Sequence, residues 1–276
     1  MTISVQTNAS AIIALQNLNR TSNDLQSAQN VVSTGLLIST AKDNASVWSI
    51  AQGQRADVGA LGTVQSSLNR AASIADVAQT AGASISDLLN QVKEKVVAAQ
   101  DPSLDATSRA AYNTDFQSLL RQITDVVNNA SFDGANILNG SLSGNISFLA
   151  NADATSFITL STQNMSLGGS IIKVGATASI FALTAAGTVL SQINTSISNV
   201  NAALGNIGAQ ATEIQNHSTF VSKLSDVLNQ GIGNLVDADM AKESAQLQAL
   251  QAQQQLGVQA LSIANSAPQI VLQLFK

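Results

Sequence analysis

The side chains that could do chemistry are few in this sequence, and the first of them is its single histidine, His217. A histidine can act as a general base or bind a metal ion, but a zinc peptidase needs two histidines on one helix face. One histidine cannot build that pair, and a chain without cysteine has no thiolate nucleophile and no cysteine-ligated metal site. We therefore interpret His217 as a polar residue on a helix, and we expect no enzymatic activity and no cofactor.

Other candidate groups have structural explanations that fit their spacing better. Asp237 and Asp239 could attract a divalent cation, but two carboxylates supply too few oxygens for Ca²⁺, so a helix start or an intersubunit contact is favoured. The glycines of 205–208 and 231–233 lack the Lys-Ser/Thr of a phosphate loop, which favours close backbone approach or bending. Trp48 could stack on a ligand, but its apolar neighbours favour a core or interface anchor.

The composition favours assembly over other binding functions. Charged residues make up 11% of the chain and aromatic residues 3%, which suits thin helix–helix seams that desolvate cheaply. A formal net charge of −5 lacks the basic surface that a nucleic-acid-binding protein needs. We also expect no membrane span, because no apolar run approaches the roughly 18–20 residues required. No secretory signal peptide is visible at the start.

Apolar residues recur at alternating spacings of four and three near both ends, within 1–40 and 236–276. Each end therefore predicts an amphipathic helix with a stripe to bury, either on the other end or on copies of the same chain. We assign a self-assembly role to the apolar residues of these two helices. They are Leu15, Leu18, Leu25, Val32, Leu36, Met240, Leu247, Leu250, Leu261, Leu272, Leu274 and Phe275.

Three further stretches, at about 61–99, 104–130 and 186–235, keep the same alternation and predict helical rods. Pro102 ends the first of them, and the short connection predicts that the second folds back antiparallel. We expect the rod core to contain the large apolar residues of the seams. They are Leu61, Leu68, Ile85, Leu89, Phe116, Ile123, Leu204, Ile207, Ile214 and Leu228.

The period changes between the second and third rods. Asp133-Gly134 and Asn139-Gly140 are hairpin-type pairs, and 146–150, 157–162 and 171–174 read as short strands. The predicted fold is mainly α, an elongated antiparallel helical bundle or coiled coil with paired terminal helices and a small β-rich central insert. Its expected domains are 1–40 with 236–276 (terminal coiled coil), 41–140 with 186–235 (rod) and 141–185 (insert).

Four segments in order resemble bacterial flagellin. They are Val32–Ala45, which contains Ser-Thr-Gly-Leu and Ala-Lys-Asp-Asn-Ala; Phe132–Leu138, which begins Phe-Asp-Gly; Val236–Ala245; and Gln255–Asn265 with the terminal 271–275. The resemblance covers about 140 N-terminal and 90 C-terminal residues, and the short insert is similar to that of alphaproteobacterial flagellins. Leu37 departs from the pattern, which commonly has a basic residue there.

This resemblance implies a structural subunit that self-assembles into the flagellar filament for swimming, outside the cell. It also implies terminal helices at the filament core, a rod wall and an insert facing solvent. The implied partners are copies of the chain, other flagellins, an export chaperone on the C-terminal helix, the flagellar type III export apparatus, and the hook-associated junction and cap proteins. Two alternatives are a hook–filament junction protein and a helical coiled-coil binding or signalling module.

Overall fold

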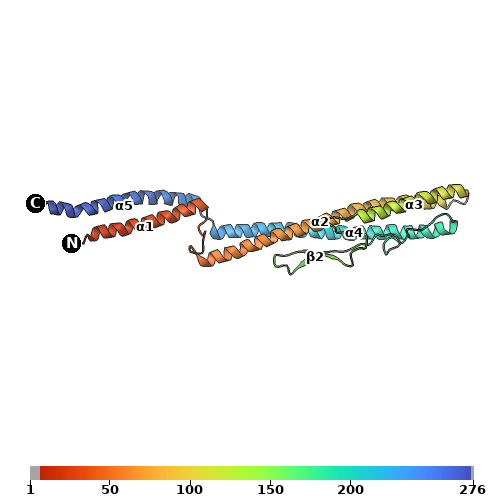
Figure 1. The fold of residues 1–276 in the computed structure, drawn as a ribbon, viewed down its shortest axis with the longest axis horizontal. Coiled ribbons are helices and arrows are strands. Elements are labelled where there is room, and N and C mark those ends of the chain that lie inside the picture. The colour runs from red at the N-terminus through yellow and green to blue at the C-terminus, as the bar shows by residue number, and fades with distance from the viewer. Residues whose placement is uncertain (1–6, 275–276) are drawn as a thin grey trace. The chain divides into compact units, whose positions relative to one another are not determined.

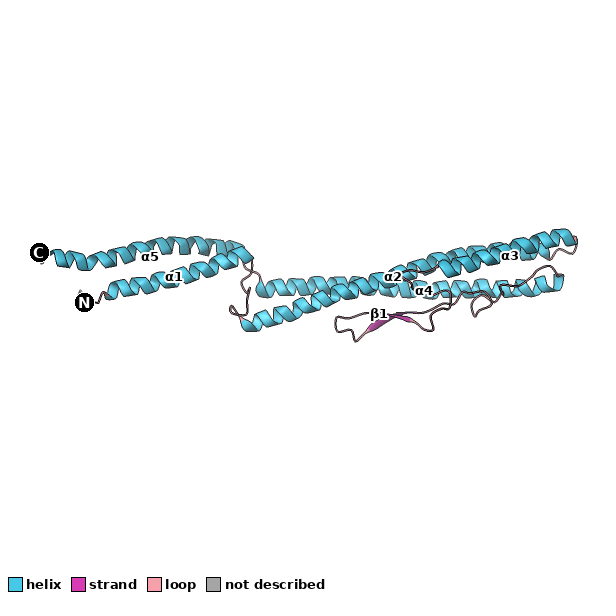
Figure 2. Cartoon of the chain, viewed as in Figure 1, coloured by secondary structure: helices cyan, strands magenta, loops and turns pink. Residues whose placement is uncertain are grey.

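The computed structural model describes residues 7–274, and the surroundings of side chains within 7–266. The described residues form helices α1 (Ala9–Thr34), α2 (Ala45–Ala99), α3 (Ala106–Asn129), α4 (Leu183–Val236) and α5 (Met240–Leu274). Two short strands, β1 (Ile146–Leu149) and β2 (Phe157–Leu160), follow α3 and precede α4 along the chain, and Figure 2 shows them in magenta. The predicted fold class, mainly α with a small β-rich insert, is confirmed.

The chain divides into two compact units. The terminal unit contains residues up to Ala56 and from Val227 onward, and the rod unit is Asp57–Asp226. The division falls inside α2 and α4, whereas the sequence placed domain limits at 40 and 236. A helix can belong to two units because its backbone hydrogen bonds are local and do not depend on what its side chains contact.

In the terminal unit α1 and α5 lie antiparallel, side by side (Figure 1). Asn8 begins α1, because its Oδ1 accepts a bond from the Ala11 N–H at 3.1 Å. Its Nδ2 donates to the Ala264 carbonyl at 2.7 Å and so ties the start of α1 to α5. Gly35 ends α1 in the left-handed conformation, with φ of 71° and its N–H bonded to the Val31 carbonyl at 2.8 Å.

The two connectors of the terminal unit also pair with each other. The Leu37 N–H donates to the Val236 carbonyl at 2.7 Å, and the Ala238 N–H donates to the Gly35 carbonyl at 3.0 Å. The helix break lies at 237–239, so the glycines of 231–233, expected to allow close backbone approach or bending, lie inside α4. As the sequence suggested for a helix start, Asp239 Oδ1 accepts bonds from the first amides of α5.

The rod unit is built on α2 and α4, which run antiparallel. Gln65 bonds to Ser218, and a Cβ on Gly82 would lie 2.5 Å from Leu204 Cδ2. After the turn at Pro102, α3 folds back along α2, and the Lys95 Nζ and Asp115 Oδ2 atoms are 2.9 Å apart. Seam residues of all three helices are fully buried, among them Leu68, Ile85, Leu89, Phe116, Ile123 and Ile207.

The insert folds onto the rods. Strand β1 pairs antiparallel with β2, from Ile146 opposite Leu160 to Leu149 opposite Phe157. The predicted third strand at 171–174 is wrong, because this segment is irregular. Its backbone binds α4 instead: the Lys173 N–H donates to Ser196 Oγ at 2.9 Å, and Asn199 Nδ2 donates to the carbonyl of residue 171 at 3.1 Å.

Candidate self-assembly surfaces

The helix pair α1/α5 has a very small core of its own. Among its described side chains, Leu25, Ala28 and Leu250 are the buried hydrophobic residues, with Leu247 partly buried against them. A stable two-helix unit needs an apolar seam along its whole length, because isolated helices are marginal in water. The pair therefore has an incomplete core within a single chain.

Several large apolar side chains of this pair are exposed instead. They are Ile12, Ile13 and Leu15 on α1, and Leu256, Val258 and Ile263 on α5, of which Ile263 is 70% exposed. The sequence between Glu243 and Lys276 contains no charged residue, so nothing on that stretch of α5 resists desolvation. Exposed apolar surface of this kind marks an interaction site.

A shallow groove of about 500 Å³ runs between the two helices. Its lining residues are uncharged, and Ile13, Leu18 and Leu256 are the large apolar ones. The helices approach closely there, because a Cβ on Gly257 would lie 3.2 Å from Leu18 Cδ1. This groove could accept apolar side chains without burying a charge.

The residues predicted for self-assembly whose side chains the structure describes divide into three groups. Leu25 and Leu250 are buried, and Leu18, Val32, Leu36, Leu247 and Leu261 are partly buried, while Leu15 and Met240 are exposed. The backbone at 272 and 274 is part of α5, but the side chains of Leu272 and Leu274 lie outside the described part, as does all of Phe275.

Five exposed residues were missed by the sequence prediction: Ile12, Ile13, Leu256, Val258 and Ile263. The prediction selected positions on the four–three seam, and these residues lie beside it. The signal that could have found them is an apolar residue off the seam in a helix that has almost no charge.

The ten predicted rod-core residues have a different environment. Eight of them are buried, and Leu204 and Leu228 are partly buried. The rod seam is thus satisfied within one chain, while the terminal pair leaves its apolar surface open.

A second groove, of about 600 Å³, lies where α1, the connector 35–44 and α5 meet. Asp43 closes the connector turn, since its Oδ2 accepts bonds from the backbone and hydroxyl of both Ser39 and Thr40. The Thr40 N–H bond is the main reason that the pKa of Asp43 lies below its ordinary value of 3.8. The groove has both polar and apolar lining residues, and the hydrogen bonds to Asp43 hold the connector turn beside it.

The groups with possible chemistry have structural roles. His217 Nε2 lies 2.7 Å from the Ala150 carbonyl at the end of β1, and Trp48 is partly buried. The described residues contain no cluster of three or more His, Cys, Asp or Glu that could hold a metal ion. None of the helices, over the part of the chain searched, is both long and apolar enough to cross a membrane.

Two family models match the chain at its ends. Residues 5–143 match the bacterial flagellin N-terminal helical region, and 188–275 match the bacterial flagellin C-terminal helical region. The chain belongs to the bacterial flagellin family. Flagellins are the structural subunits of the flagellar filament, which lies outside the cell, so this flagellin polymerises as part of a filament.

Relatives match this flagellin over its full length. Flagellin FljJ of Caulobacter vibrioides is 53% identical over 278 residues, which cover 100% of this chain and 99% of that relative. Flagellin FljM of the same organism is 46% identical, covering 99% and 98%. A flagellin of Brucella melitensis is 40% identical, covering 99% of each chain. The full-length matches favour a filament subunit over a signalling module.

Solved structures agree in fold. Bacillus cereus flagellin superposes with a TM-score of 0.50 at 17% identity, over 56% of this flagellin and 88% of that chain. A putative flagellar hook-associated protein from Vibrio parahaemolyticus gives 0.56 at 13% identity, over 71% and 100%. At these identities the likeness concerns the fold alone.

Proposed function

We propose that this flagellin polymerises because the α1/α5 pair completes its core on neighbouring copies. The observation that supports the proposal is the contrast between the small buried core of the pair and the exposed Ile12, Leu256 and Ile263. A rod unit with a complete seam gives each subunit a stable body. The terminal pair then supplies contacts that only other subunits can satisfy.

In this mechanism ordering and assembly are coupled. The terminal helices are marginally stable in the monomer, and they become fixed when a neighbour covers their apolar surface. Obligate interfaces of this kind bury about 2,000–5,000 Å² in total. Part of the gain is offset by the entropy lost when the helices become ordered.

The exposed apolar surface of α1 and α5 also has consequences for export and for binding partners. An uncovered α5, which is uncharged after Glu243, would aggregate before assembly, so we propose that an export chaperone covers it in the cell. A chain without disulfides and with marginal ends can pass unfolded through the flagellar type III export apparatus. The junction and cap proteins would meet the same terminal surface at the two ends of a filament.

A charge placed on the exposed surface tests the assembly proposal. Leu256→Asp should raise the critical concentration for polymerisation at least about tenfold, since the carboxylate must be desolvated in the filament. Its monomer should melt like the wild type, because position 256 is exposed. Sedimentation of polymer and thermal unfolding of monomer measure the two effects.

The matched control is Gln251→Asp, which adds the same charge at an exposed polar position of α5. We expect a critical concentration close to that of the wild type. Leu256→Asp filaments that form as readily as those of this control would contradict the proposal.

A further inference from the structure

A groove on the rod unit is unoccupied within the chain. It is open, about 450 Å³ in volume, and lies between α2 and α3. Val77, Ala81, Val126 and Ala130 provide its apolar lining. Such a groove is large enough for an aromatic side chain, which is the usual anchor of a protein interface.

Two of the polar residues that line this groove, Thr80 and Asn129, bond to the backbone of their own helices. Thr80 Oγ1 donates to the Asp76 carbonyl at 2.9 Å, and Asn129 Nδ2 donates to the Asp125 carbonyl at 2.8 Å. Their hydrogen-bonding capacity is therefore turned toward the helix backbone, and the groove offers an apolar surface to a partner.

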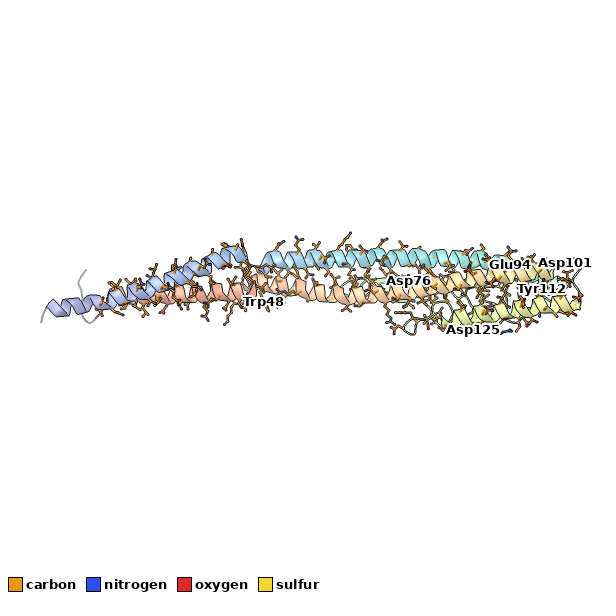
Figure 3. All side chains as sticks on the ribbon, turned by 90° about the horizontal axis from the view of Figure 1, so that it is seen from above. Trp48, Asp76, Glu94, Asp101, Tyr112 and Asp125 are labelled. Atoms are coloured by element: carbon orange, nitrogen blue, oxygen red, sulfur yellow. The ribbon has the colours of Figure 1, made fainter. Side chains whose placement is uncertain are left out.

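One group at the rim stays free. The Asp76 carboxylate makes no ion pair and accepts no hydrogen bond within residues 7–274. Figure 3 labels Asp76 on α2 and Asp125 on α3, the two helices that form the groove. The C-terminal end of α3 also lies here, and its dipole adds to the negative potential of the rim. The groove thus combines an apolar floor with a preference for a cation.

On α4, the same rod unit carries an exposed aromatic ring and a cation, which complement the apolar groove and its acidic rim. Phe220 is 56% exposed, and its ring centroid is 5.8 Å from that of His217. Since the Ala150 carbonyl holds His217, the Phe220 ring has a fixed neighbour. Lys223 follows one turn later, exposed and without a carboxylate partner in the described chain.

We propose that Phe220 of a second copy of this chain occupies the α2/α3 groove, with the Lys223 ammonium of that copy facing Asp76. The inference rests on filament formation and adds a contact between rod units to the contact between terminal pairs. The apolar side chain fits the apolar groove, and the two unpaired charges are opposite in sign.

The spacing of the groups supports this pairing. Phe220 and Lys223 are three residues apart, ~4.5 Å along the helix axis, and Thr80 in the groove and Asp76 at its rim are four residues apart, ~6 Å. The two pairs run in opposite chain directions, so the α4 of one copy docks antiparallel to the α2 of the other. Because α2 and α4 are antiparallel within one chain, both copies then point the same way.

The contact is therefore heterologous and open-ended. In one chain the Gln65–Ser218 bond places Phe220 beside α2 near position 63. The groove lies about 15 residues further along α2, so successive copies would be offset by ~23 Å along the rod. A contact with an offset between like-oriented copies produces a polymer and no closed dimer.

Two other phenylalanines are similarly exposed and serve as controls. Phe157 is 53% exposed on β2, and Phe181 is 50% exposed in the segment before α4. Neither has a lysine or arginine within four residues in the sequence. We expect Phe220→Ala to raise the critical concentration at least about tenfold, and Phe157→Ala and Phe181→Ala to change it less than about threefold.

Engineered cysteines test the contact directly, because the chain has no cysteine. Positions 80 and 220 lie ~25 Å apart along the rod within one chain, whereas a disulfide needs Cα atoms within about 7 Å. Oxidised filaments of Thr80→Cys/Phe220→Cys, copolymerised with an equal amount of wild-type chain, should contain covalent dimers and longer species. The Thr80→Cys/Phe157→Cys variant should give none.

Filaments of the first double variant without covalent dimers would overturn the inference, as would Phe220→Ala chains that polymerise like the wild type. If Leu256→Asp still blocks polymerisation in that case, the terminal-pair proposal stands and only the rod contact fails. A charge exchange gives a further readout: Asp76→Lys and Lys223→Glu should each weaken assembly, and their combination should restore it.

Discussion

Gly82 is the one glycine in an otherwise apolar stripe of α2, and the structure gives a physical reason for it. A Cβ at this position would lie 2.5 Å from Leu204 Cδ2 and 3.7 Å from Met165 Cε. The residue therefore allows α4 and the insert to approach α2 closely. The position lies on the four–three seam of α2, but its partner Leu204 comes from a segment over 120 residues away.

We predict that Gly82→Val destabilises the rod unit by about 1–3 kcal/mol, because the branched side chain overpacks the contact with Leu204. Gly59→Val is the matched control, since an added Cβ at Gly59 of α2 has no neighbour within 4 Å. Urea unfolding followed by helical circular dichroism measures both. Equal stabilities of the two variants would show that the close approach is not required.

At the scale of single elements, the connector 39–43 depends on one ionised group. Thr40 and Ser39 bond to the Asp43 carboxylate, and these bonds favour its charged form and lower its pKa. A lowered pKa in the folded state means that the stabilisation is complete above 3.8 and is lost as the pH falls through the folded value.

We therefore predict that the turn opens only in acid, below the ordinary aspartate range. The Thr40 amide resonance should titrate with a midpoint under 3.8, and in Asp43→Asn it should show no such transition. A wild-type midpoint at or above that value would mean that the hydrogen bonds do not favour the carboxylate. Asp24 and Glu243 line the groove beside this connector, so their resonances should be followed in the same spectra.

Elements defined by local signals could be predicted from the sequence, and elements defined by distant partners could not. The Asp133-Gly134 pair does form a tight turn, with φ of 50° and 76° and reciprocal bonds between Phe132 and Ala135. The predicted strand at 171–174 failed because α4 satisfies its backbone. Likewise, periodicity located the terminal helices but did not reveal the apolar residues beside their seam, such as Ile263.

For the whole molecule, the distribution of charge matters more than its sum. The formal net charge is −5, yet the stretch between Glu243 and Lys276 has none. Copies therefore repel through their other parts, while contacts made by this stretch of α5 bury no charge of its own. The fold class and the family could be predicted from the sequence, because helical seams and family motifs are local patterns. The two compact units divide within continuous helices, which no local pattern marks.

This distribution predicts that salt promotes polymerisation. Raising the ionic strength from about 0.01 to 0.15 M shortens the screening length from ~30 to ~8 Å, which weakens the repulsion between copies. The apolar terminal contact is unaffected, and the single Lys223–Asp76 pair loses at most about 1 kcal/mol. Sedimentation should show a falling critical concentration. A rising one would mean that ion pairs dominate assembly.

The end of the β1/β2 hairpin is closed by its own groups. Asn151 Oδ1 accepts bonds from the Thr155 and Ser156 amides, and the Ala150 N–H donates to the Ser156 carbonyl at 3.0 Å. Asp153 and Ala154 at its apex are exposed and bond to no rod helix. A foreign peptide spliced between them would lengthen a surface loop at small entropic cost. Every subunit would then carry the added epitope, so one filament would become a dense repetitive display scaffold.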